Sequence, residues 1–115
     1  MPLLALQTSV RLSNQQRYEL LAPLSQIVAE CIGKPERYVM ITVSETAMLM
    51  AGAEGPAAYA DIRSIGGLSR EVNRKLSECV CGLLQEQLGI PPDRVYLGFT
   101  SVSAENWGWN EGTFG

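Results

Sequence analysis

The stretch AECIGKPERYVMI at residues 29–41 and the stretch QEQLGIPPDRVYL at residues 85–97 share one pattern. In each, a run with helical spacing ends at a glycine, a proline follows two residues later, and an apolar run comes next. Gly33 and Gly89 lie 56 residues apart. Two candidate helix caps, Ser13 and Ser69, have the same spacing. The chain is therefore predicted to contain the same supersecondary unit twice.

The first predicted unit begins with an apolar-rich strand over residues 3–10 and continues with a helix. Ser13 and Gln16 have the spacing of a capping box, and Leu20, Leu24, Ile27, Val28 and Cys31 follow at helical intervals. Gly33 and then Pro35 end this helix in the usual order.

The rest of the first unit is harder to assign. Pro23 inside the helix predicts either a kink or a helix that properly starts near Leu21, because an interior proline loses a hydrogen bond. A strand is predicted over residues 38–43. Residues 44–56 carry turn residues, with a short helical or strand piece expected around residues 46–50.

The second predicted unit has a strand over residues 57–65, a helix capped by Ser69, and a strand over residues 94–101, followed by an aromatic tail at residues 105–114. The predicted fold class is α/β (α+β), with two βαβ repeats that form a four-stranded sheet with both helices on one face, plus short extra strands. Parallel βαβ units place their helices against the sheet. The other face then needs cover, and oligomerisation would supply it.

Length and composition limit what the chain can be. Its 115 residues predict one domain over residues 1–115. The charged fraction, 18%, is below the roughly 25% usual for soluble domains, which is consistent with surface buried against another subunit. The net charge is −3 and the nine Lys and Arg residues are scattered, so no nucleic acid partner is expected.

No membrane association is expected, because no apolar run approaches the roughly 20 residues of a membrane helix. The opening residues also lack the basic and apolar regions of a signal peptide. We therefore expect a cytoplasmic protein, with non-classical export left open. Cys31, Cys79 and Cys81 lie in helical apolar patterns and are expected to be structural thiols.

The chain contains no histidine, the side chain whose unperturbed pKa lies near neutrality. A general base must then be a shifted carboxylate, lysine or cysteine, or the amino terminus. Pro2 follows Met1, and removal of Met1 would leave a secondary amine; an α-amino group has a reference pKa of about 7.7 to 8.0. Partial burial and a cation such as Lys34 would disfavour its charged form. Taken alone, a proline at the second position is more often simply the first residue of a strand, and only its context favours a catalytic role.

Several short motifs together identify a family. They are Met1-Pro2, Gly33-Lys34-Pro35, Ser64-Ile65-Gly66, Cys81-Gly82-Leu83-Leu84, Pro92-Asp93-Arg94-Val95-Tyr96, Gly108-Trp109-Asn110 and Thr113-Phe114. In this order, over essentially the whole chain, they resemble macrophage migration inhibitory factor and its relative D-dopachrome tautomerase.

The resemblance implies a homotrimeric, cofactor-independent keto–enol tautomerase of the phenylpyruvate or dopachrome type, an isomerase, with no metal and a small keto or enol acid as substrate. It implies that Pro2 is the catalytic base, that Lys34 with Ser64 and the backbone at Ile65 binds the substrate, and that Tyr96 comes from a neighbouring subunit to a pocket at the interface. The implied pocket walls are Tyr38, Gly98, Trp107 and Phe114.

The sequence departs from the family at three places. Ala57-Ala58-Tyr59-Ala60 stands where vertebrate cytokine members have Cys-x-x-Cys, so no dithiol redox activity is carried over. Gly98 replaces a pocket asparagine, which removes a hydrogen-bonding side chain and is expected to open space. Trp107 replaces a smaller aliphatic residue and adds bulk.

Purely structural roles for these residues, and other functions for the chain, are alternative interpretations. Lys34 could be a solvated residue of the helix-ending turn, and Tyr96 and Trp107 could serve only in packing. The resemblance also permits a cytokine-like signalling or binding protein with a vestigial pocket. A third possibility is hydration or decarboxylation of unsaturated acids, for which Arg37 and Arg63 are the candidate arginines.

Overall fold

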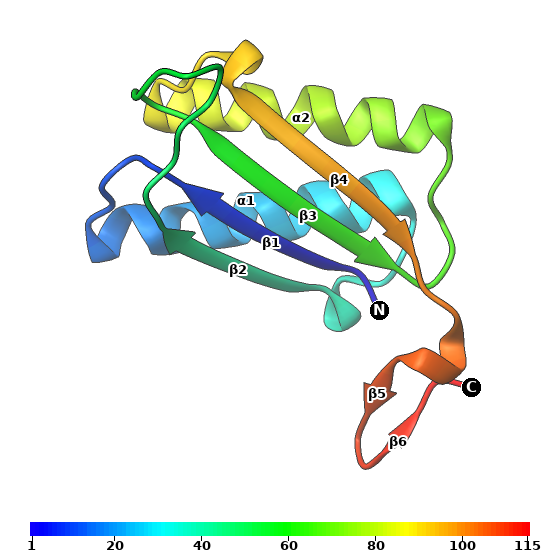
Figure 1. Cartoon of the computed structure of the whole chain (residues 1–115). Helices are drawn as coiled ribbons and strands as arrows, with labels where there is room; N and C mark the ends of the chain where they lie inside the picture. Colours follow the sequence, from blue (N-terminus) through cyan, green and yellow to red (C-terminus); the bar gives the residue numbers. More distant parts are fainter.

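Two βαβ units in succession build the protein, as a computed structural model of residues 1–115 shows (Figure 1). The first consists of β1 (Leu3–Thr8), α1 (Asn14–Ile32) and β2 (Met40–Glu45), and the second of β3 (Ala58–Ser64), α2 (Arg70–Leu88) and β4 (Val95–Ser101). Short 3₁₀ turns precede β2 and β4 and follow β4, at Glu36–Tyr38, Pro92–Arg94 and Ala104–Asn106. A small hairpin of β5 (Gly108–Trp109) and β6 (Gly112–Thr113) ends the chain.

The four long strands form one mixed sheet in the order β2-β1-β3-β4. Within each unit the two strands are parallel, and the units join through the antiparallel pair β1 and β3, in which Leu3 lies opposite Arg63 and Thr8 opposite Ala58. The predicted pair of βαβ repeats and the predicted short extra strands are thus confirmed.

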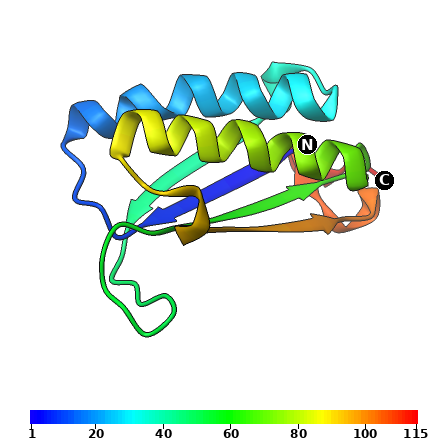
Figure 2. The same ribbon diagram turned by 90° about the horizontal axis from the view of Figure 1, so that it is seen from above.

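Both helices cover the same face of the sheet, as Figure 2 shows. Alternate residues of β1 and β3 point at this face, which explains their alternating burial. The core that results is a single cluster; its fully buried members include Leu4, Leu6, Ile62, Leu20, Leu24, Val28, Leu76, Val80 and Leu84. The opposite face of the sheet has no helix over it.

The helix ends follow the sequence signals. Ser13 accepts a hydrogen bond from the Gln16 backbone N–H at 3.1 Å, and the Gln16 side chain accepts one from the Ser13 N–H at 2.9 Å, which completes the capping box. Gly33 and Gly89 end the helices at φ of 77° and 67°, in the left-handed region where glycine carries no steric penalty. The helix runs through Pro23 from Asn14, so the alternative start near Leu21 is wrong.

Two predicted strands begin later than expected. Tyr38 and Arg94 each close a 3₁₀ turn that follows a proline, and the strands start at Met40 and Val95. These turns could not be predicted from the sequence, because a 3₁₀ helix of three residues is too short to produce a periodic pattern of apolar residues. Residues 46–56 contain only an isolated bridge between Met50 and Ala53.

Arg94 holds this connection in place. Its guanidinium donates to the carbonyl oxygens of Pro56, Met50 and Ala53 at 2.9, 3.2 and 3.0 Å. One fixed fork of donors therefore organises a segment that lacks regular structure.

The face of the sheet without helices carries large apolar side chains. Met40 on β2 is 62% exposed, Tyr96 on β4 is 66% exposed, and Tyr59 on β3 is 39% exposed. This matches the expectation that the second face requires cover. Neither helix is apolar enough over a sufficient length to cross a membrane.

Candidate active site

Pro2 lies at the entrance to β1 and its side chain is fully buried. Its carbonyl oxygen accepts a hydrogen bond from the Met40 N–H at 3.0 Å, which joins the start of β1 to the start of β2. The parallel pairing of β1 and β2 therefore fixes the backbone on the carbonyl side of Pro2.

The amino group of the chain lies in a partly desolvated place beside Pro2. The Met1 ammonium donates to the Tyr38 carbonyl oxygen at 3.1 Å. Burial lowers the pKa of this amino group below its ordinary value of 8.0, and the nearby Lys34 ammonium lowers the pKa further. While Met1 is attached, the Pro2 nitrogen is an amide; loss of Met1 would turn it into the amine of the same region.

A cavity of about 410 Å³ opens around this terminus, and eleven residues line it. Four of the predicted site residues come together here, from the two ends of the chain and from the turn before β2. The lining residues are Met1, Pro2, Leu3, Arg37, Tyr38, Val39, Met40, Trp107, Gly108, Trp109 and Phe114. Predicted residues Pro2, Tyr38, Trp107 and Phe114 thus share one cavity.

Three aromatic rings make one wall of the cavity. Trp109 and Phe114 are stacked with centroids 5.3 Å apart, and Tyr38 meets each of them edge-on at 6.1 Å. The Arg37 guanidinium lies over the Tyr38 ring at 4.8 Å from its centroid. Trp109 was not among the predicted site residues, although it belongs to the Gly108-Trp109-Asn110 motif.

The hairpin turn brings Trp109 and Phe114 to this wall. Asn110 and Glu111 both have positive φ, 51° and 68°, as a two-residue turn between Trp109 and Gly112 requires. The Phe114 N–H then donates to the Trp107 carbonyl oxygen at 3.1 Å.

Lys34, Ser64 and Ile65 do not line this cavity. Lys34 nevertheless lies near enough to lower the pKa of the terminal amino group. Ser64 is fully buried, and its hydroxyl donates to the Gly66 carbonyl oxygen at 2.7 Å, so its side chain stabilises the turn after β3. Ser64 therefore offers a substrate no exposed side chain in this chain, whereas Ile65 is half-buried.

Tyr96 and Gly98 lie away from Pro2 in the same chain. Tyr96 pairs with Tyr59 near the start of β3, whereas β1 begins beside Arg63 near the end of β3. A single copy thus leaves Tyr96 outside the cavity that contains Pro2, and only a second copy could bring it there.

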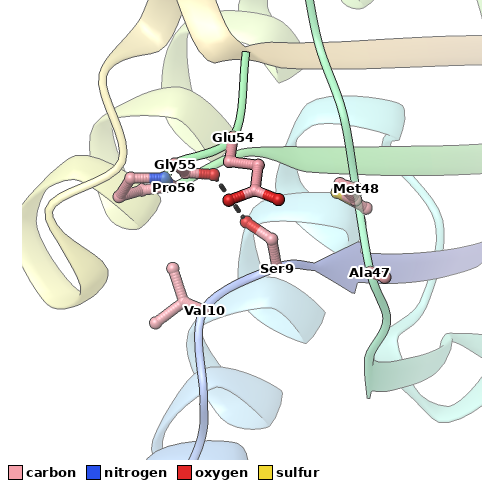
Figure 3. Close-up of a pocket in the computed structure, with 7 residues that line it drawn as sticks. All are labelled: Ser9, Val10, Ala47, Met48, Glu54, Gly55 and Pro56. Carbon is pink, nitrogen blue, oxygen red and sulfur yellow. Dashed lines mark hydrogen bonds between the residues drawn. The ribbon is translucent and has the colours of Figure 1, made fainter.

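A hollow of about 440 Å³ at the other end of β1 is a weaker candidate site (Figure 3). The Ser9 hydroxyl is engaged in the structure of the chain: it donates to the Gly55 carbonyl oxygen at 2.9 Å. It also accepts from the Ala57 N–H at 3.0 Å. Glu54 is the one ionisable residue that lines it. This hollow marks the junction between β1 and the 46–56 connection.

The sequence model of the family described as macrophage migration inhibitory factor (MIF) matches residues 1–115. The chain belongs to the macrophage migration inhibitory factor family. The protein of that name from Rattus norvegicus is 37% identical over 116 residues, which cover 99% of each chain. The homologue from Prochlorococcus marinus superposes with a TM-score of 0.93 at 42% identity, covering 98% of this chain and 99% of the other. The related protein from Entamoeba histolytica gives 0.94 at 31% identity, with 98% of each chain covered.

This member of the macrophage migration inhibitory factor family has a glycine, Gly98, where the family pattern has an asparagine, and the structure shows what lies beside it. A Cβ atom on Gly98 would lie 2.7 Å from the Tyr59 hydroxyl oxygen. The expectation that Gly98 opens space is therefore wrong at this point, because a tyrosine from the adjacent strand fills it. The other departures, Ala57–Ala60 and Trp107, lie at the start of β3 and on the cavity wall.

Proposed function

We propose that the chain, as one domain over residues 1–115, is a cofactor-independent keto–enol tautomerase in which the amine of Pro2 is the general acid and base. The observation that carries the proposal is the desolvated terminus: Pro2 is buried at an aromatic cavity, and burial together with Lys34 lowers the pKa of the amino group beside it. Such an amine has a larger neutral fraction at a given pH than an ordinary α-amine.

The reaction needs one base and one source of positive charge. The neutral Pro2 nitrogen takes the proton from the carbon next to the substrate carbonyl, and the electron pair of that C–H bond forms the enolate. Lys34 stabilises the negative charge that develops on oxygen. The prolinium then returns its proton to the enolate oxygen, so that the keto acid becomes its enol; the reverse direction uses the same groups.

The cavity favours ring-bearing carbonyl acids of the phenylpyruvate or dopachrome type. The rings of Tyr38, Trp109 and Phe114 supply an apolar wall for a substrate ring, and Arg37 adds a cation for its carboxylate. None of the eleven lining residues is acidic, so the cavity offers no carboxylate to activate water for hydration. Tautomerisation needs no such group.

The direct test is turnover of phenylpyruvate by the purified chain that begins at Pro2, followed through the ultraviolet absorbance of the enol. We expect catalysed interconversion that saturates with substrate. A folded protein with a free Pro2 and no turnover of phenylpyruvate or of a D-dopachrome ester would instead favour the alternative, a cytokine-like binding protein with a vestigial pocket.

We further propose that the active form is a homotrimer with the site at the subunit interface. The exposed Met40, Tyr59 and Tyr96 need cover on the sheet face, and Tyr96 can join Pro2 only from another copy. Light scattering should give about three times the mass of one chain. Tyr96→Asp should lower that mass, because it places a charge in the contact, whereas Tyr18→Asp on the outer side of α1, where Tyr18 is 73% exposed, should not. A monomeric mass for the unaltered protein would contradict the trimer.

Lys34→Ala should lower kcat/KM for phenylpyruvate by about 10-fold or more, since a hydrogen bond to a charged group is worth about 1.5 to 3 kcal/mol. Steady-state kinetics on the chain that begins at Pro2 would measure the loss. Lys75→Ala is the matched control, because Lys75 lies in the groove between α1 and α2. Equal kinetics for Lys34→Ala and the unaltered protein would mean that Lys34 is only a solvated residue of the turn and does not bind substrate.

A further inference from the structure

The hydroxyl of Tyr59 occupies the position that a side chain at residue 98 would take. A Cβ on Gly98 would lie 2.7 Å from the Tyr59 hydroxyl oxygen and 3.6 Å from two carbons of the ring. Real Cβ atoms essentially never come within 3.0 Å of another heavy atom, so a side chain at residue 98 would require the Tyr59 hydroxyl, at the far end of its side chain, to shift. The glycine and the tyrosine therefore form a matched pair.

The strand register explains how the pair forms. Tyr59 lies beside Tyr96, and Asp61 lies beside Gly98, so Gly98 is the diagonal neighbour of Tyr59 on the adjacent parallel strand. Residues 59, 96 and 98 share the sheet face without helices, since Ala58, Ala60 and Val95 are buried on the other side. The ring of Tyr59 spans from β3 to β4 on this face.

Tyr59 and Tyr96 also line one hollow of about 420 Å³ together with apolar residues of the connection that Arg94 organises. All nine lining residues of the hollow are hydrophobic in type. The Tyr59 hydroxyl is therefore a polar group at the border of an apolar surface, where a neutral donor and acceptor can discriminate between ligands.

We propose that Tyr59 is a specificity-determining residue, whose phenol hydroxyl supplies at the Tyr96 side of the interfacial site the hydrogen bond that Gly98 cannot make. This inference rests on the proposed function, in which Tyr96 and its neighbours face the Pro2 cavity of another copy. Lys34 and Arg37 belong to the Pro2 side, where the proposed function assigns the enolate oxygen to Lys34 and the substrate carboxylate to Arg37. Tyr59 arrives with the second subunit and meets the opposite end of the substrate.

The inference names a substrate class: aromatic keto acids with a polar group on the ring, remote from the carboxylate. A phenol hydroxyl both donates and accepts one hydrogen bond, so it fits a ring hydroxyl better than an unsubstituted ring. One neutral hydrogen bond is worth about 0.5 to 1.5 kcal/mol, which corresponds to about 2- to 13-fold in affinity.

The test compares phenylpyruvate with 4-hydroxyphenylpyruvate as probes, on the full chain that begins at Pro2. Tyr59→Phe should raise KM for 4-hydroxyphenylpyruvate by about 3- to 10-fold and leave kcat within about 2-fold, since one neutral hydrogen bond is removed. The constants for phenylpyruvate should stay within about 2-fold. Tyr18→Phe, which removes the exposed hydroxyl on α1, is the matched control and should change neither substrate.

Gly98→Ala provides an independent arm, because it displaces the Tyr59 hydroxyl without removing it. Its backbone is not in the left-handed region, so alanine introduces no backbone strain. We expect the same selective rise in KM, and no further rise when Tyr59→Phe is added. The ratio between the two substrates, unlike overall activity, is insensitive to a general loss of folded protein.

Two outcomes would overturn the inference. If both substrates weaken equally in Tyr59→Phe, or if neither changes, Tyr59 has no role in specificity while the proposed function stands. If the unaltered chain turns over neither keto acid, the proposed function is wrong, and this inference, which rests on it, is wrong as well.

Discussion

A chain that keeps Met1, or that carries any residue before Pro2, should turn over phenylpyruvate at least about 100-fold more slowly than the chain that begins at Pro2. The acylated proline nitrogen is an amide without basicity, and a positioned general base contributes about 10²- to 10⁴-fold. Kinetics on both forms, with each N-terminus verified by mass spectrometry, would measure the difference.

The control for this experiment is to restore activity in the same protein sample by removing the N-terminal extension. A removable N-terminal extension should suppress activity, and its cleavage to expose Pro2 should restore it without any change in the rest of the chain. Full activity in an extended protein that mass spectrometry shows to be intact would mean that another group carries the proton.

Much of the fold could be predicted because local signals in the sequence agree with the packing. Ser13, Gln16, Gly33 and Gly89 mark helix ends that the structure reproduces. The late starts of β2 and β4 could not be predicted, since each depends on a 3₁₀ turn of three residues with no period of its own.

The candidate site was predictable to the extent that short motifs carry its residues. Pro2, Tyr38, Trp107 and Phe114 meet in one cavity, although they come from opposite ends of the chain. Trp109 was missed because its place on the wall depends on the hairpin turn at residues 110 and 111.

The contact between Tyr59 and Gly98 shows the limit of the sequence most clearly. The two residues are far apart in the chain, and no motif links them; the register of β3 against β4 alone places the ring over the glycine. A departure from a family pattern therefore predicts a change of side chain at one position, but the structure decides what fills the space.

The pH dependence of activity follows from the environment of the terminus. The base works in its neutral form, so kcat/KM should rise with pH through the pKa of the Pro2 amine. Burial and Lys34 lower the pKa of the Met1 amino group, and we expect the same two causes to act on the Pro2 amine, so the midpoint should lie below the ordinary value of 8.0. Lys34→Ala should move the midpoint upward, because one of the two causes is removed.

The pH profile of kcat/KM can be assigned to Pro2 because few other groups in the chain could titrate near neutral pH. Burial raises the pKa of the Cys81 thiol, and burial together with Cys79 raises the pKa of the Cys31 thiol, both above the ordinary value of 9.0. Replacing all three cysteines by serine should therefore leave the profile of kcat/KM in place, whereas Pro2→Gly should move or erase it. If the cysteine-free variant loses the titration and Pro2→Gly retains it, a thiol carries the proton and the proposed mechanism is wrong.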